Sequence, residues 1–379
     1  MGVSVSVIRP PNRVRIDRAA LAHNMDQVKR LVSSKTRIMG IVKSDAYGHG
    51  SVSVSQSLAA SGVDRLGVAH IHEALELREH GVRLPIVVLC GVRTREDADA
   101  AVERRLTPVI FDKASVEMLA EACARKRKKL NVQVKIDTGM GRLGISCSDV
   151  APFLQTILGH KSLHPEALMS HLAMADEPES TFTGVQIERF QQAVEAGRSI
   201  GLELPLNNLA NSAAIMAHAK AHFDMVRPGI MLYGGLPSPR FQSPVSLKPV
   251  MHFEGCVLQT RDLEDRSPVS YGSTYHTRGD RTIGVLSAGY ADGIPRSLSN
   301  RGQALIGGQR VEIVGRVCMN MTMVDITGLK GVKPGTRVVF MGEQGDQRIS
   351  GDDIARWADT IAYEVFGSIG RRNPREYVS

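Results

Sequence analysis

The stretch Arg37-Ile-Met-Gly-Ile-Val-Lys-Ser-Asp-Ala-Tyr-Gly-His-Gly50 places a lysine directly after a short apolar run. We predict a strand over Ile38–Val42, with Lys43 at its carboxyl end, a flexible loop over Ser44–Gly50 and then a helix. An amine at the mouth of a buried strand is desolvated, which lowers its pKa and makes it a candidate nucleophile or base. A solvated surface lysine is the plainer alternative. The hydroxyl of Tyr47, four residues on, can reach back over the same strand end.

Strands and helices alternate for about 200 residues after this point. Near-continuous apolar strands between amphipathic helices indicate a parallel sheet that is covered by helices. Eight such units fit a (β/α)₈ barrel better than an open sheet. The strand candidates are residues 37–43, 65–69, 85–90, 107–110, 131–137, 167–171, 205–209 and 224–232, with helical patterns at 72–80, 114–128, 182–200 and 211–219.

A Pro/Ser-rich connector over residues 236–244 separates this pattern from a different one. Short alternating strands with glycine turns follow, and a helix is expected over 350–365. We therefore predict an α/β chain with two domains. Residues 1–240 form a TIM-like barrel that carries the lysine, and residues 241–379 form a mostly antiparallel β domain. The first strand, near residues 13–17, could join the β domain instead.

The composition is that of an ordinary globular protein, with 379 residues, 42% hydrophobic and 23% charged. No apolar run approaches the roughly 18–20 residues of a membrane span, and no secretory signal pattern opens the chain. Five widely spread cysteines with no Cys-x-x-Cys pair argue against disulfides and zinc. We expect a cytoplasmic protein without a metal site or membrane contact.

The net charge of +8 raises the question of nucleic-acid binding. The densest basic cluster, Arg125-Lys-Arg-Lys-Lys129, closes a helical pattern, where cations favour the carbonyl end of the helix. No aromatic residues alternate with it as stacking platforms. We therefore expect no nucleic-acid partner, and a basic surface fits anionic small molecules equally well.

The last two barrel strands end in segments suited to hold a phosphate group. Strand seven leads into Asn208-Leu-Ala-Asn-Ser212, and strand eight carries Arg227-Pro-Gly-Ile230. Ser212 opens a helix, and Gly229 lets the backbone there and at Ile230 approach an anion closely. Taken alone, Ser212 could simply be a helix cap. Two such elements after strands seven and eight favour a phosphate site.

The segment Lys135-Ile-Asp-Thr-Gly-Met-Gly-Arg-Leu-Gly144 contains a G-x-G-x-x-G pattern after a strand. That pattern is typical of dinucleotide-binding folds. Such a fold would place the strand near its start, whereas about four strand–helix units precede it here. No acidic strand end follows about 20 residues later, so we set the dinucleotide interpretation aside.

Eight segments in order resemble the motifs of alanine racemases, and the resemblance runs from about Val14 to Arg375. It implies an isomerase with pyridoxal 5'-phosphate as a Schiff base on Lys43 that interconverts L- and D-alanine. D-Alanine for bacterial peptidoglycan is the implied use. The segments are residues 43–50, 135–144, 167–176, 208–212, 227–230, Val269-Ser-Tyr-Gly-Ser-Thr-Tyr275, Gly289-Tyr-Ala-Asp-Gly-Ile-Pro-Arg296 and Val314-Gly-Arg-Val-Cys-Met-Asn320.

The resemblance assigns the barrel residues to the cofactor and the substrate. Arg227 faces the pyridine nitrogen; it keeps its proton and leaves that nitrogen unprotonated, which favours racemisation over other cofactor reactions. Arg142 contacts the substrate carboxylate, and Lys135 matches a lysine that is carbamylated in many of these enzymes. His171 stacks beneath the ring. The residues assigned to the cofactor phosphate are Tyr47, Asn211, Ser212, Gly229 and Ile230.

The β domain supplies the second base in this family, and the matching residue is Tyr271. Racemisation needs one base on each face of Cα, so Lys43 acts on the D-alanine hydrogen and Tyr271 on the L-alanine hydrogen. The family takes this tyrosine from the partner subunit, which implies a homodimer. The backbone amide of Met319 helps to bind the substrate carboxylate. The corridor to the site is lined by Asp176, Tyr290, Arg296 and Arg316.

Two positions depart from the family pattern. Asn320 replaces a usual aspartate, and Arg371 stands where many relatives have a tyrosine that touches the phosphate and bounds the substrate pocket. Arginine can still hold a phosphate. Arg371 leaves open a racemase of the same fold that prefers serine or a basic amino acid. A pyridoxal phosphate carrier without catalysis is a further alternative, although such carriers resemble the barrel alone. A basic amino-acid decarboxylase lacks the glycine-rich strings found here.

Overall fold

The computed structural model describes residues 10–177 and 179–379. The first nine residues, which bear on the expected lack of a secretory signal, lie outside the described range. The chain forms two compact units. The barrel unit comprises Leu21–Ala46 and Ser51–Lys248, and the β unit comprises the described residues 10–20, Tyr47–Gly50 and Pro249–Ser379.

The barrel unit contains a parallel sheet with the strand order β7-β6-β5-β4-β3-β2-β8. Isolated bridges join Asn208 to Met169 of β7 and to Met225 of β8, which closes the ring in place of an eighth strand. The barrel fold predicted from the alternating pattern is confirmed. The strands are β2 (Arg37–Ile41), β3 (Arg65–Val68), β4 (Ile86–Val88), β5 (Thr107–Ile110), β6 (Leu130–Lys135), β7 (Leu163–Met169) and β8 (Met225–Val226).

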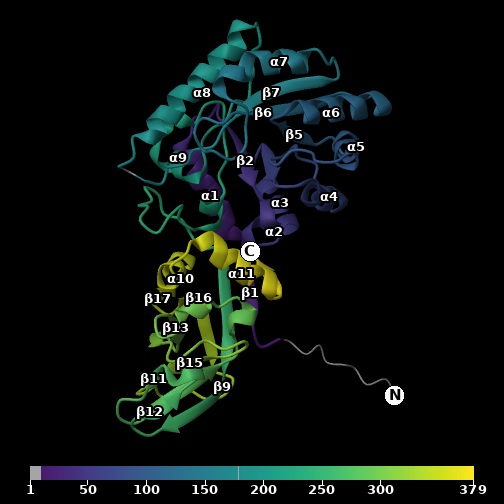
Figure 1. The fold of residues 1–379 in the computed structure, drawn as a ribbon. Coiled ribbons are helices and arrows are strands. Elements are labelled where there is room, and N and C mark those ends of the chain that lie inside the picture. The colour runs from purple at the N-terminus through teal and green to yellow at the C-terminus, as the bar shows by residue number, and fades with distance from the viewer. Residues whose placement is uncertain (1–9, 178) are drawn as a thin grey trace, which may run out of the picture. The chain divides into compact units, whose positions relative to one another are not determined.

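Helices lie outside this sheet, most plainly α4–α8 in Figure 1. Their inward residues are buried, and side-chain caps fix the starts of α5, α6 and α9; for example, Asp112 accepts a hydrogen bond from the Ser115 N–H at 2.7 Å. The helices are α1 (Arg18–Leu31), α2 (Lys43–Tyr47), α3 (Ser51–Ala60), α4 (Ile71–Glu79), α5 (Arg95–Glu103), α6 (Lys113–Lys126), α7 (Val150–Leu158), α8 (Phe182–Ser199) and α9 (Ser212–Ala217), with short 3₁₀ turns η1 (Cys147–Asp149), η2 (Ala219–Ala221) and η3 (Ile230–Tyr233).

The last two predicted barrel strands were too long. Residues 205–209 contribute only the two isolated bridges at Asn208, and the side chain of Asn207 bonds to β7, where its Oδ1 accepts from the Leu168 N–H at 2.9 Å. The strand predicted over 224–232 stops at Val226. Pro228 has no N–H to donate, and the chain turns into η3 at Ile230.

The β unit is a mostly antiparallel sheet, as predicted. Its main strand path is β14-β13-β16-β9-β1-β18, and β1 pairs antiparallel with β9 and parallel with β18. The strands are β1 (Arg13–Asp17), β9 (Met251–Leu263), β10 (Pro268–Val269), β11 (Tyr275–His276), β12 (Arg281–Leu286), β13 (Gln303–Ile306), β14 (Gln309–Glu312), β15 (Thr322–Asp325), β16 (Arg337–Gln344), β17 (Gln347–Ile349) and β18 (Arg375–Val378).

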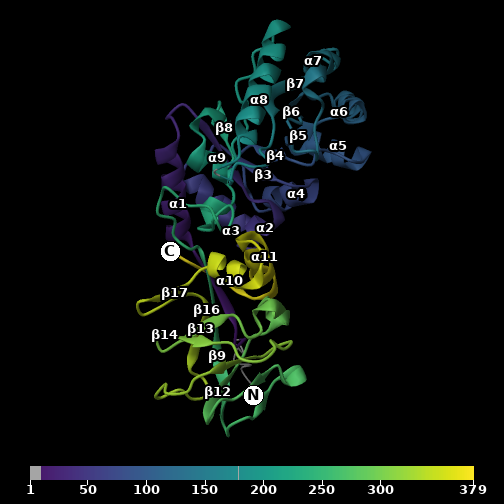
Figure 2. The same cartoon turned by 60° about the vertical axis from the view of Figure 1, so that its left-hand side comes forward.

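The single helix predicted over 350–365 is wrong. Two helices, α10 (Gly351–Ala358) and α11 (Ala362–Arg372), lie beside one another in this unit (Figure 2). The break occurs because Asp359 takes a left-handed conformation, with φ 56°, and Ile361 is extended. The 3₁₀ turns of this unit are η4 (Tyr271–Ser273), η5 (Tyr290–Asp292) and η6 (Arg296–Leu298).

Among the described residues, no helix is long and apolar enough to cross a bilayer. Nor do His, Cys, Asp and Glu side chains in that part of the chain gather in a group that could hold a metal ion. All five cysteines are free thiols.

Candidate active site

The backbone after Lys43 is a left-handed turn and not the flexible loop that we predicted. Ser44, Asp45 and Ala46 have φ between 51° and 58° and ψ between 45° and 48°, and Tyr47 has φ 57°. This conformation costs about 1–2 kcal/mol for each residue other than glycine. Four such residues in a row persist only where the surroundings hold them, and this occurs next to the candidate lysine.

Two carboxylates hold this turn. Glu73 on α4 accepts hydrogen bonds from the N–H of Ser44 and of Ala69, both at 2.6 Å, and so joins the turn to the end of β3. Asp45 accepts from the N–H of Ser51 at 2.8 Å, at the start of α3. The turn is thus built into two neighbouring elements, and it fixes the backbone from which Lys43 projects.

Lys43 shares its electrostatic environment with other cations at the carboxyl ends of the barrel strands. Burial and then Arg142 lower the pKa of the Lys43 amine, while Cys90 and Glu73 raise it to a smaller extent. Lys135, at the end of β6, has a pKa well below its usual value because of burial, Arg227 and Arg142. Both amines are therefore closer to their neutral, nucleophilic form than a free lysine.

Arg227 is buried, with 5% of its surface exposed, and its guanidinium is held on several sides. It donates to Asn208 Oδ1, to the carbonyl of Ser170 at 2.6 Å and to that of Leu209 at 3.1 Å. Burial and Arg142 lower its pKa to about 9, so it keeps its charge at neutral pH.

His171 meets this guanidinium at the end of β7. Arg227 Nη2 lies 3.4 Å from His171 Nδ1. Burial, followed by Lys135 and Arg227, holds the pKa of this imidazole well below its usual range, so the ring is neutral. An arginine can only donate, so Nδ1 is the acceptor and the ring proton belongs on Nε2.

The predicted phosphate segments come together through Ser212. Its Oγ accepts hydrogen bonds from the N–H of Gly229 at 2.9 Å and of Met231 at 3.4 Å. Asn211 caps α9 by accepting from the Ala214 N–H at 3.0 Å. Ser212 and Ile230 are the first residues of α9 and η3, so their N–H groups have no acceptor within those helices. The hydroxyl proton and these N–H groups suit an anion.

The other predicted residues near the barrel strands are Asp176 and Tyr47. Asp176 is half-buried and follows β7. Tyr47 belongs by its contacts to the β unit, where its ring lies 5.6 Å from that of Tyr363. Burial and then Tyr363 raise the pKa of its hydroxyl, so Tyr47 is a neutral hydrogen-bonding group.

In the β unit, Tyr271 begins η4 and is 71% exposed. The residue before it, Ser270, has φ 67° and donates from Oγ to the carbonyl of Arg316 at 2.6 Å. A Cβ built on Gly272 would lie 3.1 Å from Arg316 Nη1. The η4 backbone and Arg316 are therefore close together, and the tyrosine ring projects towards solvent.

Tyr290 and Met319 lie on two adjoining loops of the same unit. The N–H of Tyr290 donates to Cys318 at 3.0 Å, and that of Ala291 donates to the carbonyl of Met319 at 2.8 Å. Met319 is 57% exposed, and Asn320 lies 3.4 Å from Asp292.

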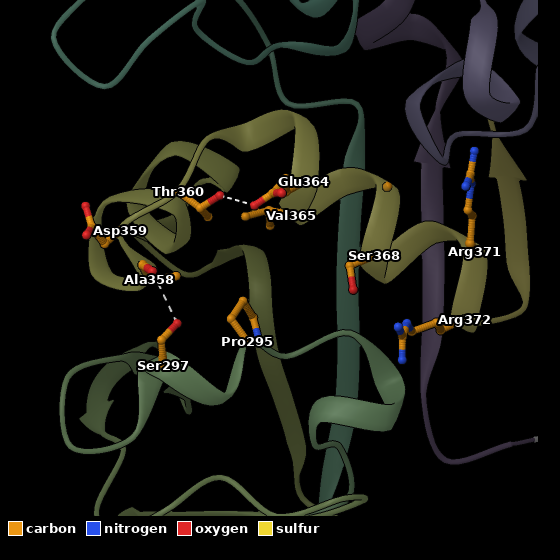
Figure 3. A pocket seen from close by; sticks show the side chains of 11 residues that line it. Pro295, Ser297, Ala358, Asp359, Thr360, Glu364, Val365, Ser368, Arg371 and Arg372 are labelled. Carbon is orange, nitrogen blue, oxygen red and sulfur yellow. Dashed lines mark hydrogen bonds between the residues drawn. The ribbon is translucent and has the colours of Figure 1, made fainter.

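Arg296 and Arg371 are both exposed. Arg371 lines a pocket of about 800 Å³ between η6 and the α10–α11 pair. In Figure 3 its side chain leaves α11 in a different direction from that of Arg372, which donates to the Tyr290 carbonyl at 3.3 Å. No acidic partner is recorded for the Arg371 guanidinium within the described residues.

Three residues near the site were not singled out from the sequence: Glu73, Gln186 and Ser170. Glu73 holds the left-handed turn, and the other two bond to residues of the strand ends. Asn208 was quoted only as the start of a phosphate segment, yet it contacts Arg227. A buried polar residue at a strand end was the one available signal for Ser170 and Asn208.

Comparison with known families now adds to this geometry. Residues 16–237 match the N-terminal domain of alanine racemase, and residues 250–377 match its C-terminal domain. The chain is 40% identical to alanine racemase 2 of Caldanaerobacter subterraneus subsp. tengcongensis over 97% of its own length and 95% of that protein. It is also 40% identical to the alanine racemase of Syntrophobacter fumaroxidans, with 96% of each chain covered.

The solved structures that resemble this chain belong to the same family. An alanine racemase from Clostridium difficile superposes with a TM-score of 0.91 at 32% identity, covering 98% of this chain and 96% of that one. The alanine racemase from Bartonella henselae with covalently bound pyridoxal phosphate has a TM-score of 0.86 at 29% identity, covering 98% and 100%. The family matches span both units, and the chain belongs to the alanine racemase family.

Proposed function

We propose that this protein uses pyridoxal 5'-phosphate to interconvert L- and D-alanine, with Lys43 and Tyr271 as the two bases. The observation that carries the proposal is the cluster of Lys43, Lys135, Arg142 and Arg227, in which burial and the two arginines lower the pKa of both lysines. We assign this cluster and the cofactor lysine to the barrel domain, residues 1–240, and the second base to the β domain, residues 241–379.

The residues present fit the cofactor. Lys43 offers an amine with a lowered pKa, and Ser212, Gly229 and Ile230 offer a hydroxyl and backbone N–H groups to a phosphate. Asn211, Tyr47 and Arg371 would complete the phosphate contacts, and His171 would lie against the ring. When bound, pyridoxal phosphate withdraws electrons from Cα of the amino acid attached to it and makes the Cα–H bond acidic.

Two bases on opposite faces of Cα make the reaction reversible between enantiomers. Lys43 takes the proton from D-alanine and returns one to form it, and Tyr271 does the same for L-alanine. Arg227 would face the ring nitrogen, and because it keeps its own proton it would leave that nitrogen unprotonated. Arg227 would thereby favour a rapid return of the proton to Cα over competing reactions.

Substrate binding rests on Arg142 and the Met319 backbone amide, which we assign to the alanine carboxylate. Lys135 is a buried amine among cations, and a neutral amine can add CO₂ to give a carbamate and release a proton. The carbamate would place a negative charge beside Arg142 and orient it. Asp176, Tyr290, Arg296 and Arg316 are assigned to the corridor that leads to the site.

We also propose a homodimer in which Tyr271 serves the partner's Lys43. Tyr271, Met319 and Met321 are large and exposed, and a Ser270–Cys318 contact of 3.5 Å joins the loops that carry Tyr271 and Met319. Neighbouring exposed apolar groups of this kind support a partner surface. A cytoplasmic location and a supply of D-alanine for bacterial peptidoglycan complete the proposal.

Arg371 favours one second candidate, a racemase of the same fold with a broader substrate range. Its exposed guanidinium lines a pocket together with Glu364 and Ser368, so the space there is polar. Rates measured side by side on alanine, serine and lysine decide between the two. Alanine is expected to be fastest.

The test is a coupled assay of D-alanine formed from L-alanine, with added pyridoxal phosphate, on the wild type and on Lys43→Ala and Tyr271→Phe. Lys43→Ala should lose both turnover and the cofactor's visible absorbance. Tyr271→Phe should keep the absorbance and lose at least about 100-fold in rate, as expected for a lost general base. Tyr275→Phe is the matched control, a nearby tyrosine with no proposed role. Full activity in Lys43→Ala would refute the proposal.

A further inference from the structure

Gln186 lies on α8, outside the residues that we assign to the cofactor or the substrate. It is fully buried, and so are Ser170 at 0% exposure and Thr138 at 1%. Thr138 precedes the loop that ends in Arg142, and Ser170 precedes His171 at the end of β7. These three side chains therefore lie behind the two strand ends that carry the candidate site.

The amide of Gln186 bonds to both strand ends. Nε2 donates to Thr138 Oγ1 at 3.2 Å and to the carbonyl of His171 at 3.1 Å. Oε1 accepts from the N–H of Ala173 at 2.9 Å. A primary amide has two protons to donate and an oxygen that accepts, and here each is engaged.

The direction of the hydrogen bonds beyond Gln186 is fixed. Ser170 Oγ donates to the carbonyl of Ile136 at 2.8 Å, so it must accept in its 2.8 Å contact with Thr138 Oγ1. Thr138 thus donates to Ser170 and accepts from Gln186. The chain of hydrogen bonds runs from Gln186 to Thr138, then to Ser170 and to the Ile136 carbonyl. Its first residue must be a donor.

This chain of hydrogen bonds ends beside the cationic cluster. The carbonyl of Ser170 accepts from Arg227 at 2.6 Å, and the carbonyl of Thr138 accepts from Arg189 Nη1 at 3.0 Å. After Thr138, the N–H groups of Gly139, Met140 and Gly141 all bond to Asp137, at 2.8–3.1 Å. Arg142 follows directly, so the short, hydrogen-bonded loop fixes the position of Arg142 relative to Thr138.

A buried glutamine always needs partners, so satisfied hydrogen bonds alone would indicate only stability. Gln186 differs because its partners are not on its own helix but on two separate strand ends. We propose that Gln186 is a positioning residue that sets the distance between the Arg142 loop and the His171–Arg227 pair. This inference rests on the proposed role of Arg142 in binding the substrate carboxylate.

The experiment measures kcat and KM for L-alanine and the inhibition constant of propionate, a carboxylate without the amine, on the holoenzyme. The variants are Gln186→Leu, Thr138→Val and the double variant. Gln191→Leu is the matched control, an exposed glutamine on the same helix. A displaced Arg142 should raise KM and the propionate constant at least about tenfold in Gln186→Leu, since small misplacements cost up to about 100-fold. Gln191→Leu should stay within about twofold.

If both residues act through one chain of bonds, the double variant should lose no more than the worse single variant. If the effects of the two single variants multiply in the double variant, the two residues do not act through one chain of hydrogen bonds. If Gln186→Leu lowers Tm but leaves KM and the propionate constant unchanged, Gln186 only stabilises the fold. Should Gln186→Leu fail to fold, Gln186→Glu replaces it, because glutamate keeps the shape and the acceptor and loses both donated bonds. Arg142→Ala separates the two proposals: unchanged KM there refutes the role of Arg142 itself, whatever Gln186 does.

Discussion

At the scale of single residues, the candidate site is a concentration of positive charge with little negative charge to balance it. Burial and the two arginines, Arg142 and Arg227, lower the pKa of both Lys43 and Lys135, and burial and Arg142 lower that of Arg227. A phosphate and a substrate carboxylate are the anions that such a cluster can accept. Burial, together with repulsion from the same cations, lowers the pKa of His171 and keeps it neutral, so that Nδ1 can accept from Arg227.

Lys135 gives a prediction about the pH dependence of stability. Its pKa in the folded chain lies below the 10.5 of a free lysine, so the unfolded chain binds more protons between the two values. The free energy of unfolding should therefore rise with pH across this window, with a contribution of up to about 1.4 kcal/mol per pH unit. Lys135→Met should remove that contribution.

Urea unfolding from pH 7 to pH 10 checks this in CO₂-free buffer, so that no carbamate forms. Lys126→Met is the control, because the hydrogen bond of that surface lysine to Glu103 raises its pKa, in the direction opposite to the shift of Lys135. If the free energy of unfolding has the same slope against pH in the wild type and in Lys135→Met, the folded chain keeps the Lys135 amine charged.

At the scale of elements, the left-handed turn after β2 depends on Glu73. Its two carboxylate oxygens bond separately to Ser44 and Ala69, each at 2.6 Å. Glu73→Gln keeps only one accepting oxygen, so the N–H of Ser44 or of Ala69 loses its carboxylate acceptor, at a cost of about 1 kcal/mol. We expect a lower Tm and weaker retention of pyridoxal phosphate, because the backbone under Lys43 shifts.

Calorimetry and the visible absorbance after dialysis measure these two effects. Glu76→Gln, an exposed glutamate on the same helix, should change neither. A Glu73→Gln protein as stable and as well loaded as wild type would mean that the turn is held by its own packing.

The elements differ in how far the sequence predicts them. The strands β2–β6 were predicted because most of their residues are apolar, and these residues are buried in the sheet, as all three residues of β4 are. The turn at Ser44–Tyr47 was not predicted, because Ser-Asp-Ala-Tyr contains no glycine to favour positive φ. Glu73, which holds the turn, lies about 30 residues away in the sequence. The sequence does not distinguish Gln186 from Gln191, because both lie in the same predicted helix.

At the scale of the whole molecule, the two ends of the chain meet in one sheet. Arg13–Asp17 pairs with Met251–Glu254 of β9 and with Arg375–Val378. Local pattern predicts a strand at Arg13–Asp17 but cannot predict partners more than 230 residues away. The β unit is therefore completed only when the last strand has been made.

The proposed dimer predicts that two inactive variants restore each other. Lys43→Ala lacks one base and Tyr271→Ala lacks the other, so each alone should be inactive. In a mixed dimer that takes Tyr271 across the interface, one site has both residues and the other has neither. Random mixing makes half the dimers mixed, so the activity should return to about a quarter of wild type. Purified variants are mixed, dissociated in mild denaturant, reassociated and assayed. No recovery, with mixed dimers confirmed by mass spectrometry, would place Tyr271 in its own chain's site.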